Sequence, residues 1–273
     1  MSTAPRIAAL LIALLLTGGI ALGARCASAT QAQCSIASLT GDAPKLDVPY
    51  ARTRPEVVRL MLDMAEVRPG DRVLDLGTGD GRVLLAAVER GATGLGVDID
   101  PVLVAEAQAE AERRGLSARA RFRVEDLFRT PLGDADVLAM FLLPEVNLRL
   151  RPRILSEMRP GARVVSHAFD MGDWRPDAHG RAGGARVYLW RVPARVAGRW
   201  RLLVPGRAPA ELELTQRYQF VGGALAGERV EGRLDGGGLR FTAGGRAFEG
   251  RVDGSAMVAA PGTPPWRAER VGG

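Results

Sequence analysis

The stretch that most constrains this chain is Val73–Arg82, which reads Val-Leu-Asp-Leu-Gly-Thr-Gly-Asp-Gly-Arg. An apolar run, Arg72–Leu76, stops at three glycines in five positions, and a helical pattern begins at Arg82. Glycine has no Cβ, so a backbone of this kind can turn sharply and approach a ligand closely. The stretch therefore predicts a strand, a tight loop, and a helix whose first N–H groups are free.

The spacing of these glycines argues against a phosphate ligand. A dinucleotide-binding loop has the pattern G-x-G-x-x-G, whereas the glycines here follow G-x-G-x-G. Asp75 and Asp80 also lie where a pyrophosphate would need only N–H groups. A loop that adds carboxylates suits a ligand with positive charge and no phosphate. S-adenosylmethionine, which has a sulfonium and an ammonium group, fits this description.

Three features after the loop extend the pattern. A second predicted strand, Gly94–Asp98, ends in an acid about twenty residues past the loop, the separation at which an acid in a βαβ unit reaches ribose hydroxyls. Arg121–Asp126 is a third strand that ends in an acidic pair, and Ala135–Leu143 is a fourth, apolar strand. With these features, residues 48–204 resemble the class I, seven-stranded S-adenosylmethionine-dependent methyltransferases. The competing interpretation is an ordinary β-turn-α joint with solvated acids.

The order of the predicted elements favours an α/β fold. Strands alternate with helices, which implies a Rossmann-like, doubly wound and mostly parallel sheet covered on both faces. Ligands then bind at the carboxyl ends of the strands, where the acids lie. Thr53 is a candidate cap of the first helix. The helices are predicted at Glu56–Val67, Arg82–Arg90, Pro101–Arg114 and Glu145–Met158.

Beyond Asp170 the pattern changes to strands without helices. Val187–Val192 and Arg199–Val204 are predicted to complete the sheet as an antiparallel edge. From Ala210 onward, short alternating segments between Gly-rich turns predict a small β-rich C-terminal module, either an antiparallel meander or a small barrel. The predicted domains are a signal peptide or N-terminal membrane anchor (1–35), a linker (36–47), a methyltransferase domain (48–205) and the C-terminal module (206–273).

An apolar run near the N-terminus has two interpretations. Ile7–Leu22 follows Arg6 and precedes the small residues Ala27–Ala29, which is typical of a secretory signal peptide. The run could also be an uncleaved anchor, although about sixteen residues is short for a full span. S-adenosylmethionine is made in the cytosol, and positive charges after the run permit an anchor with the domain on the cytoplasmic side. We expect membrane association, with export after signal-peptide cleavage as the alternative.

Composition excludes several kinds of site. Both cysteines, Cys26 and Cys34, lie in the N-terminal segment, so the folded part has none for a disulfide framework and no metal site is expected. A Cys26–Cys34 disulfide is conceivable only if both residues survive processing. The formal charge of +6 invites a nucleic-acid partner, but the arginines are spread along the chain and alternate with acids. No nucleic-acid partner is therefore expected.

A combination of motifs narrows the resemblance. Val48–Tyr50 precedes a Thr-x-Pro-x-Val-Val helix start, Leu142–Asn147 reads Leu-Leu-Pro-Glu-Val-Asn, and Val164–Phe169 reads Val-Val-Ser-His-Ala-Phe. Together they resemble the membrane-associated protein-lysine methyltransferases of the adenine nucleotide translocase and ATP synthase c-subunit type, with their bacterial relatives. Two departures, the segment Tyr50–Pro55 and the β-rich C-terminus, bear on the substrate more than on the chemistry.

The resemblance implies a set of cofactor contacts. By this resemblance, Asp80 would bind the methionine ammonium, Asp98 the ribose hydroxyls and Asp126 the adenine amine. Tyr50 would fold over the cofactor. The complete set expected to bind S-adenosyl-L-methionine is Tyr50, Asp75, Gly77, Thr78, Gly79, Asp80, Gly81, Asp98, Ile99 and Asp126.

The resemblance also implies an acceptor side. Pro144 and Trp174 are the substrate candidates, and Asn147 and His167 are the catalytic candidates. Each has a plainer interpretation: Asn147 as a helix cap or turn residue, His167 as a strand-end histidine, and Trp174 as a packing residue.

The expected function is S-adenosylmethionine-dependent N-methylation of a lysine side chain in a protein, by in-line methyl transfer. The expected partner is a protein substrate, with a membrane protein as one candidate. Two alternatives stay open. One is a small-molecule or lipid methyltransferase on the same fold, and the other is a non-catalytic binding protein with a degenerate methyltransferase scaffold.

Overall fold

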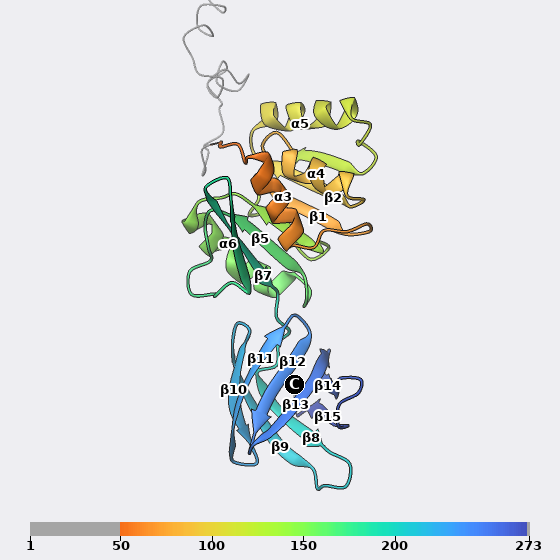
Figure 1. Cartoon of the computed structure of the whole chain (residues 1–273), viewed down its shortest axis with the longest axis vertical. Helices are drawn as coiled ribbons and strands as arrows, with labels where there is room; N and C mark the ends of the chain where they lie inside the picture. Colours follow the sequence, from red (N-terminus) through yellow and green to blue (C-terminus); the bar gives the residue numbers. More distant parts are fainter. Residues whose placement is uncertain (1–49, 272–273) are drawn as a thin grey trace, which may run out of the picture. The chain divides into compact units, whose positions relative to one another are not determined.

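Figure 1 shows the computed structural model of the chain, which describes residues 50–271. The predicted signal peptide or anchor (1–35) and linker (36–47) lie outside these residues. None of the helices within 50–271 is both long and apolar enough to cross a membrane. The described chain forms a mixed sheet with helices and then a closed β-barrel.

The first part is a seven-stranded sheet with the strand order β3-β2-β1-β4-β5-β7-β6. β7 (Ala185–Arg191) and β6 (Ala178–Ala182) form an antiparallel edge beside β5. The remaining five strands run parallel, and they are β1 (Arg72–Leu76), β2 (Thr93–Asp98), β3 (Ala120–Val124), β4 (Val137–Met140) and β5 (Arg163–His167). This arrangement confirms the predicted Rossmann-like, mostly parallel fold.

The strand order reverses at β1, which has β2 on one side and β4 on the other. Asp75 of β1 is in register with Gly96 of β2 and with Ala139 of β4. In open α/β sheets, ligands bind outside the carboxyl ends of the strands at such a reversal. The glycine loop follows β1 directly and therefore lies at the edge of the sheet where a ligand is expected.

Prolines set the start of three of the helices in the described chain. Proline is favoured at the first helical position because the N–H that it lacks would have no helical partner there. α5 is also capped by Asp100, whose carboxylate accepts a 2.8 Å hydrogen bond from the N–H of Val102. The helices are α3 (Pro55–Met64), α4 (Arg82–Glu89), α5 (Pro101–Arg113) and α6 (Pro144–Glu157).

The predicted cap of the first helix is wrong. The N-cap of α3 is Arg54, and no side chain makes a cap hydrogen bond there. The hydroxyl of Thr53 instead lies 3.1 Å from a ring nitrogen of His167, at the end of β5. A Pro at the first turn already removes one of the N–H groups that a cap would satisfy.

One face of the sheet packs against helices α3, α4 and α5. Successive strand residues point to opposite faces, so every second residue of a strand enters the same core. The residues of this core include Val57 and Met61 of α3, Leu84 and Val88 of α4, Ala107 of α5, and Val73, Val137, Val165 and Val187 of the strands.

The second part is an eight-stranded antiparallel barrel closed in the order β10-β11-β12-β13-β14-β15-β8-β9. It confirms the barrel alternative predicted for the C-terminal module. The strands are β8 (Gly198–Leu203), β9 (Ala210–Arg217), β10 (Phe220–Leu225), β11 (Glu228–Asp235), β12 (Gly238–Ala243), β13 (Arg246–Asp253), β14 (Ala256–Ala259) and β15 (Arg267–Arg270).

Aromatic side chains fill the barrel. Phe241 and Phe248 stack with ring centroids 4.6 Å apart, and Trp266 meets both rings edge-on. Trp200 and Met257 have no exposed surface and belong to the same core. Small barrels of eight strands are commonly filled by their own side chains. The interior is therefore a packed core.

Two strand assignments from the sequence need correction. The segment predicted as Arg199–Val204 pairs with β9 and β15 of the barrel, so it does not complete the sheet. The second strand of the antiparallel edge, beside β7, is instead β6, which the sequence did not reveal because its residues are mostly exposed. The barrel thus begins at Gly198, inside the range 48–205 given to the first domain.

Candidate functional site

The glycine spacing of the loop after β1 is required by packing and backbone angles. Gly77 and Gly81 have φ values of +72° and +78°, a region that L-residues with side chains rarely adopt. A Cβ on Gly77 would lie 2.8 Å from the side chain of Leu142, and one on Gly81 would lie 2.7 Å from the Phe122 ring. The backbone angles and the close side chains therefore favour glycine at these two positions.

The N–H groups of the loop are mostly bonded within the protein. Those of Gly77 and Thr78 both donate to the carbonyl of Val97, at 2.9 Å each. The N–H of Gly79 donates to the carboxylate of Asp98, also at 2.9 Å. A loop that binds phosphate needs free N–H groups. This loop offers carboxylate oxygens instead, as the sequence predicted.

Asp75 is the most perturbed of these acids. It is 3% exposed at the end of β1, and its carboxylate accepts a 2.7 Å hydrogen bond from the Thr78 hydroxyl. Burial raises the pKa of Asp75 to about 7, and the nearby charge of Asp98 adds to the rise, while the Thr78 hydrogen bond opposes it. A buried carboxyl with this pKa would be stabilised in its charged form by a cation.

Asp98 ends β2 and points at the same loop. Its carboxylate accepts hydrogen bonds from the N–H groups of Gly79 and Asp100, at 2.9 and 3.1 Å. Burial raises the pKa of Asp98, and those two backbone hydrogen bonds oppose the rise. The glycine loop and the acid predicted about twenty residues beyond it are thus brought into direct contact.

An apolar surface lies beside Asp98. Ile99 follows β2 and is 39% exposed, and Val124 at the end of β3 is 54% exposed. Asp98 and Val124 are partners in the β2–β3 register. Asp126 lies just beyond, with its carboxylate bonded to the N–H of Phe128 at 2.8 Å. Two apolar side chains next to strand-end acids suit a flat ring such as adenine attached to a ribose.

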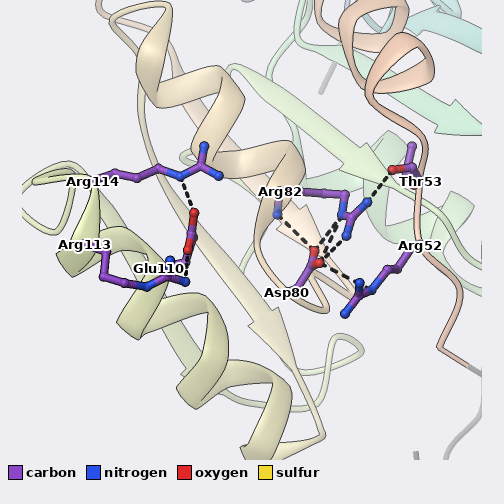
Figure 2. Close-up of polar contacts among 7 residues, drawn as sticks. All are labelled: Arg52, Thr53, Asp80, Arg82, Glu110, Arg113 and Arg114. Carbon is purple, nitrogen blue, oxygen red and sulfur yellow. Dashed lines mark hydrogen bonds and ion pairs between the residues drawn. The ribbon is translucent and has the colours of Figure 1, made fainter. Parts of the chain in front are cut away.

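Asp80 is engaged with two arginines, as Figure 2 shows. Its carboxylate accepts from Nε of Arg82 at 2.8 and 3.1 Å, and a second nitrogen of Arg82 also contacts it. Nε of Arg52 lies 3.8 Å from the same carboxylate. The predicted partner of Asp80, a methionine ammonium, would share it with these guanidinium groups. The Arg52 contact could not be seen in the sequence pattern, because short-range motifs do not carry long-range pairings.

Arg82 also holds the segment Ala51–Arg54 against the loop. Its Nη1 donates to the backbone carbonyl of Thr53 at 2.9 Å (Figure 2). Arg54, the next residue, donates to the carbonyl of Gly183 in the β6–β7 turn at 3.3 Å. The segment is therefore fastened both to the glycine loop and to the far edge of the sheet.

His167, a catalytic candidate from the sequence, lies at the carboxyl end of β5. Its Nδ1 is 3.1 Å from the Thr53 hydroxyl, and its ring centroid is 3.8 Å from that of Phe141. The ring of Phe169 lies 6.5 Å from Phe141. Burial lowers the pKa of His167. The end of β5 thus presents an imidazole among aromatic rings, and the sequence did not single out Phe141 or Phe169 as part of this cluster.

Asn147 organises the chain after β5. It is fully buried in the first turns of α6, and its Nδ2 donates to Ser166 Oγ and to the carbonyls of Phe169 and Asp170, at 3.2–3.3 Å. Its Oδ1 has no hydrogen-bond partner among the described residues. The contacts support the turn interpretation over the cap interpretation, because the N-cap of α6 is Leu143. An unpaired buried oxygen is costly, which marks it as a group that a ligand or water would satisfy.

The remaining predicted site residues differ in exposure. Pro144 begins α6 at the exposed surface, and Tyr50 is 38% exposed. Trp174 has no exposed surface and lies 5.9 Å from the Trp190 ring and 6.0 Å from the Tyr218 ring. These contacts fit the packing interpretation of Trp174.

Comparison with known proteins gives a consistent family. The model of the ANTKMT methyltransferase domain matches residues 75–178. A protein-lysine N-methyltransferase of Saccharolobus islandicus (strain REY15A) is 40% identical over 131 residues, which cover 47% of this chain and 81% of that protein. The adenine nucleotide translocase lysine N-methyltransferase of Mus musculus is 36% identical over 149 residues, 54% of this chain and 65% of that protein.

Among solved structures, an RNA methyltransferase from Salinibacter ruber in complex with S-adenosyl-L-homocysteine is 41% identical. It superposes with a TM-score of 0.52 and covers 54% of this chain and 96% of its own. The range 75–178 matched by the family model contains the glycine loop, the strand-end acids and the residues described above at the carboxyl end of β5, and it ends before the barrel. The chain therefore belongs to the S-adenosylmethionine-dependent protein-lysine N-methyltransferase family.

Proposed function

We propose that this protein methylates the side-chain amine of a lysine in a protein substrate. The observation that carries the proposal is the pair of carboxylates, Asp75 and Asp98, around a glycine loop in which most N–H groups are already bonded. These two carboxylates suit a cationic nucleoside ligand. S-adenosylmethionine supplies, when bound, a methyl group already activated for displacement. Asp75, Asp98 and the apolar surface of Ile99 and Val124 would hold it.

The acceptor side suits an amine that reacts as the neutral base. A lysine ammonium has a reference pKa of about 10.4 and must lose its proton before it can attack. A desolvated channel favours the neutral amine, and so does a nearby positive charge. The aromatic rings of Phe141 and Phe169 would line such a channel beside the cationic donor. The protein's main contribution is then to hold donor and acceptor in near-attack geometry.

Asn147 and His167 are the residues proposed to contact the acceptor. Asn147 fixes the backbone of Phe169 and Asp170, and His167 ends the neighbouring strand. No Cys nucleophile or His–carboxylate pair was found in the sequence of this region, so we propose that proton removal from the amine depends on desolvation. Relatives named for the adenine nucleotide translocase and for the ATP synthase c-subunit make these two protein types the first substrates to test.

The decisive experiment identifies the methylated residue. The full chain is incubated with methyl-labelled S-adenosylmethionine and a bacterial extract separated into protein, RNA and lipid fractions. We expect label in protein, released as methyl-lysine after acid hydrolysis, and loss of label with Asp98→Ala. Label confined to RNA or lipid would contradict the lysine proposal and leave the methyltransferase assignment intact.

We further propose that Ile7–Leu22 associates the protein with a membrane, because this run is almost continuously apolar. Membrane pelleting of the full chain, followed by mass analysis of its N-terminus, distinguishes an uncleaved anchor from a cleaved signal peptide. An intact N-terminus in the membrane pellet supports an anchor. A chain that starts after Ala29 and stays in the supernatant would show a cleaved signal peptide.

A further inference from the structure

The contact between Thr53 and His167 joins two distant parts of the chain. Thr53 precedes α3 and is 4% exposed, and His167 ends β5 and is 7% exposed. The Thr53 Oγ1 to His167 Nδ1 distance is 3.1 Å across 114 residues of sequence. The backbone of Thr53 is fixed separately, because its carbonyl accepts from Arg82. The segment that places the Thr53 hydroxyl beside the imidazole therefore also contacts the glycine loop.

The direction of this hydrogen bond follows from what each group can do. A Thr hydroxyl has one proton to donate, and a neutral imidazole has one nitrogen that donates and one that accepts. Within residues 50–271, Thr53 Oγ1 has no other acceptor for its proton. A buried donor without a partner is costly. Thr53 is thus expected to donate to Nδ1, which leaves the imidazole proton on Nε2.

We infer that Thr53 is a positioning residue that holds His167 in the Nε2-protonated tautomer, so that His167 donates a hydrogen bond to the protein substrate. A backbone carbonyl beside the target lysine is the group that such a donor would bind. In this tautomer His167 does not accept the proton of the attacking amine. The inference rests on the proposed function for the identity of the substrate, but the tautomer itself belongs to the free protein.

Two features support a donor role for His167. Its burial lowers the pKa, which favours the neutral ring. No hydrogen-bond partner of Nε2 is present within residues 50–271, while Phe141 covers the ring at 3.8 Å. The opposite polarity, with Nδ1–H donating to Thr53, would leave Nε2 as a base. The two arrangements predict different spectra.

The test uses long-range ¹H–¹⁵N correlation spectra of the full chain labelled at histidine. The chain has two histidines, so His179→Gln assigns the signals of His167. We expect the pattern of an Nε2-protonated ring in the wild-type protein and in Thr53→Ser. Thr53→Val, which removes the hydroxyl and keeps the shape, should give a mixture of tautomers. An Nδ1-protonated pattern in the wild type, or an unchanged spectrum in Thr53→Val, overturns the inference.

A kinetic arm tests the consequence for the substrate. Thr53→Val should raise KM for the protein acceptor by roughly tenfold, which is the largest effect of a single neutral hydrogen bond. The calorimetric Kd of Thr53→Val for S-adenosylmethionine should stay unchanged. Thr53→Ser should have a KM near that of the wild type. Thr242→Val, an exposed threonine of the barrel, is the matched control. An unchanged KM in Thr53→Val overturns the substrate contact. If no lysine is methylated, the proposed function fails, and the spectra still decide the tautomer.

Discussion

At the residue scale, the burial of the Asp75 carboxyl group opposes the stability of the free protein once the group is charged. Its pKa of about 7 means that the folded protein holds this carboxyl in an environment that disfavours its charge. A buried carboxyl group with a strongly raised pKa is a candidate for a functional site. The conflict gives two predictions.

Asp75→Asn should remove a pH dependence of stability. The folded pKa of about 7 lies above the ordinary value of 3.8. The contribution of this group to the free energy of unfolding is therefore intact below pH 4 and is lost as the pH rises towards 7, by up to about 4 kcal/mol. Urea unfolding of the cofactor-free wild type and variant across this range measures the difference. Parallel curves would contradict the raised pKa.

Binding of S-adenosylmethionine should release protons from the wild-type protein. A bound cation favours the charged carboxylate, so it lowers the pKa of Asp75 and expels the proton that part of the population holds near pH 6.5. Calorimetric titrations in buffers of different ionisation enthalpy count the protons released. Asp75→Asn should bind more weakly and release none, and equal release from both proteins would assign the protons to another group.

Residue roles could be predicted only where they follow the local pattern. The strand-end acids Asp75 and Asp98 were predicted from their positions after apolar runs, and the structure brings them to one loop. The partner of Thr53 could not be predicted, because the local pattern of a Thr before a Pro is that of a helix cap. Its hydroxyl meets a residue on another strand, and only the tertiary fold supplies that contact.

At the element scale, the β6–β7 hairpin carries an unfavourable pair. Arg181 lies directly opposite Arg186 in the register. Neither arginine has a carboxylate within 4.0 Å among residues 50–271, although Arg186 donates to the Tyr188 hydroxyl at 3.4 Å and is attracted by the charge of Asp170. Like charges directly opposite in a sheet are destabilising. This hairpin lies beside the end of β5, where the acceptor site is proposed.

Arg181→Glu should therefore stabilise the protein. Replacing the repulsive pair with an attractive one should raise the free energy of unfolding by roughly 0.2–1 kcal/mol, and the gain should fall at high salt. Arg251→Glu, at a barrel position opposite Gly238 and Val258, serves as the control for net charge. An equal change in both variants, measured by urea unfolding, would show that net charge rather than pairing is responsible.

The observed helices and parallel strands agree closely with those predicted from the sequence, whereas two antiparallel strands, β6 and β10, were not predicted. α4, for example, is predicted as Arg82–Arg90 and observed as Arg82–Glu89. β10 escaped prediction because Gly222 and Gly223 interrupt the β-branched pattern that marks strands. Gly223 has φ +134°, and a Cβ there would lie 2.0 Å from the carbonyl oxygen of Glu213. Gly223, which interrupts the strand pattern in the sequence, is thus required by the close packing of β10 against β9.

At the scale of the whole molecule, one buried ion pair joins three elements. Arg163 of β5 donates to both carboxylate oxygens of Asp71, at 2.7 and 3.2 Å, just before β1. It also donates to the carbonyls of Ala65 and Glu66 after α3, at 3.1 Å each. Burial opposes the charge of Asp71, but the hydrogen bonds from Arg163 and Arg68 hold its pKa below the ordinary value.

Arg163→Met should cost about 3–5 kcal/mol of unfolding free energy, because it removes the buried partner of the Asp71 carboxylate and leaves only the contacts with the exposed Arg68. Adding Asp71→Asn should recover part of the loss. Since the folded pKa of Asp71 is lowered, the pair stabilises the protein above about pH 4, and its contribution is lost as the pH falls further. Arg72→Met, at a more exposed neighbour, is the control. A loss of less than about 1 kcal/mol in Arg163→Met at neutral pH would contradict this role.

Closure of the barrel restricts how copies of the chain can associate. Every barrel strand has a hydrogen-bonded neighbour on both sides, so the barrel offers no backbone edge to which another strand could be added. Among residues 50–271, the sheet by contrast ends in two edge strands, β3 and β6, each with a strand neighbour on one side only. Both edge strands are short and carry exposed arginines, which discourage pairing with a second chain. The fold thus resists growth by strand addition at the barrel through its topology, and at the sheet through charge.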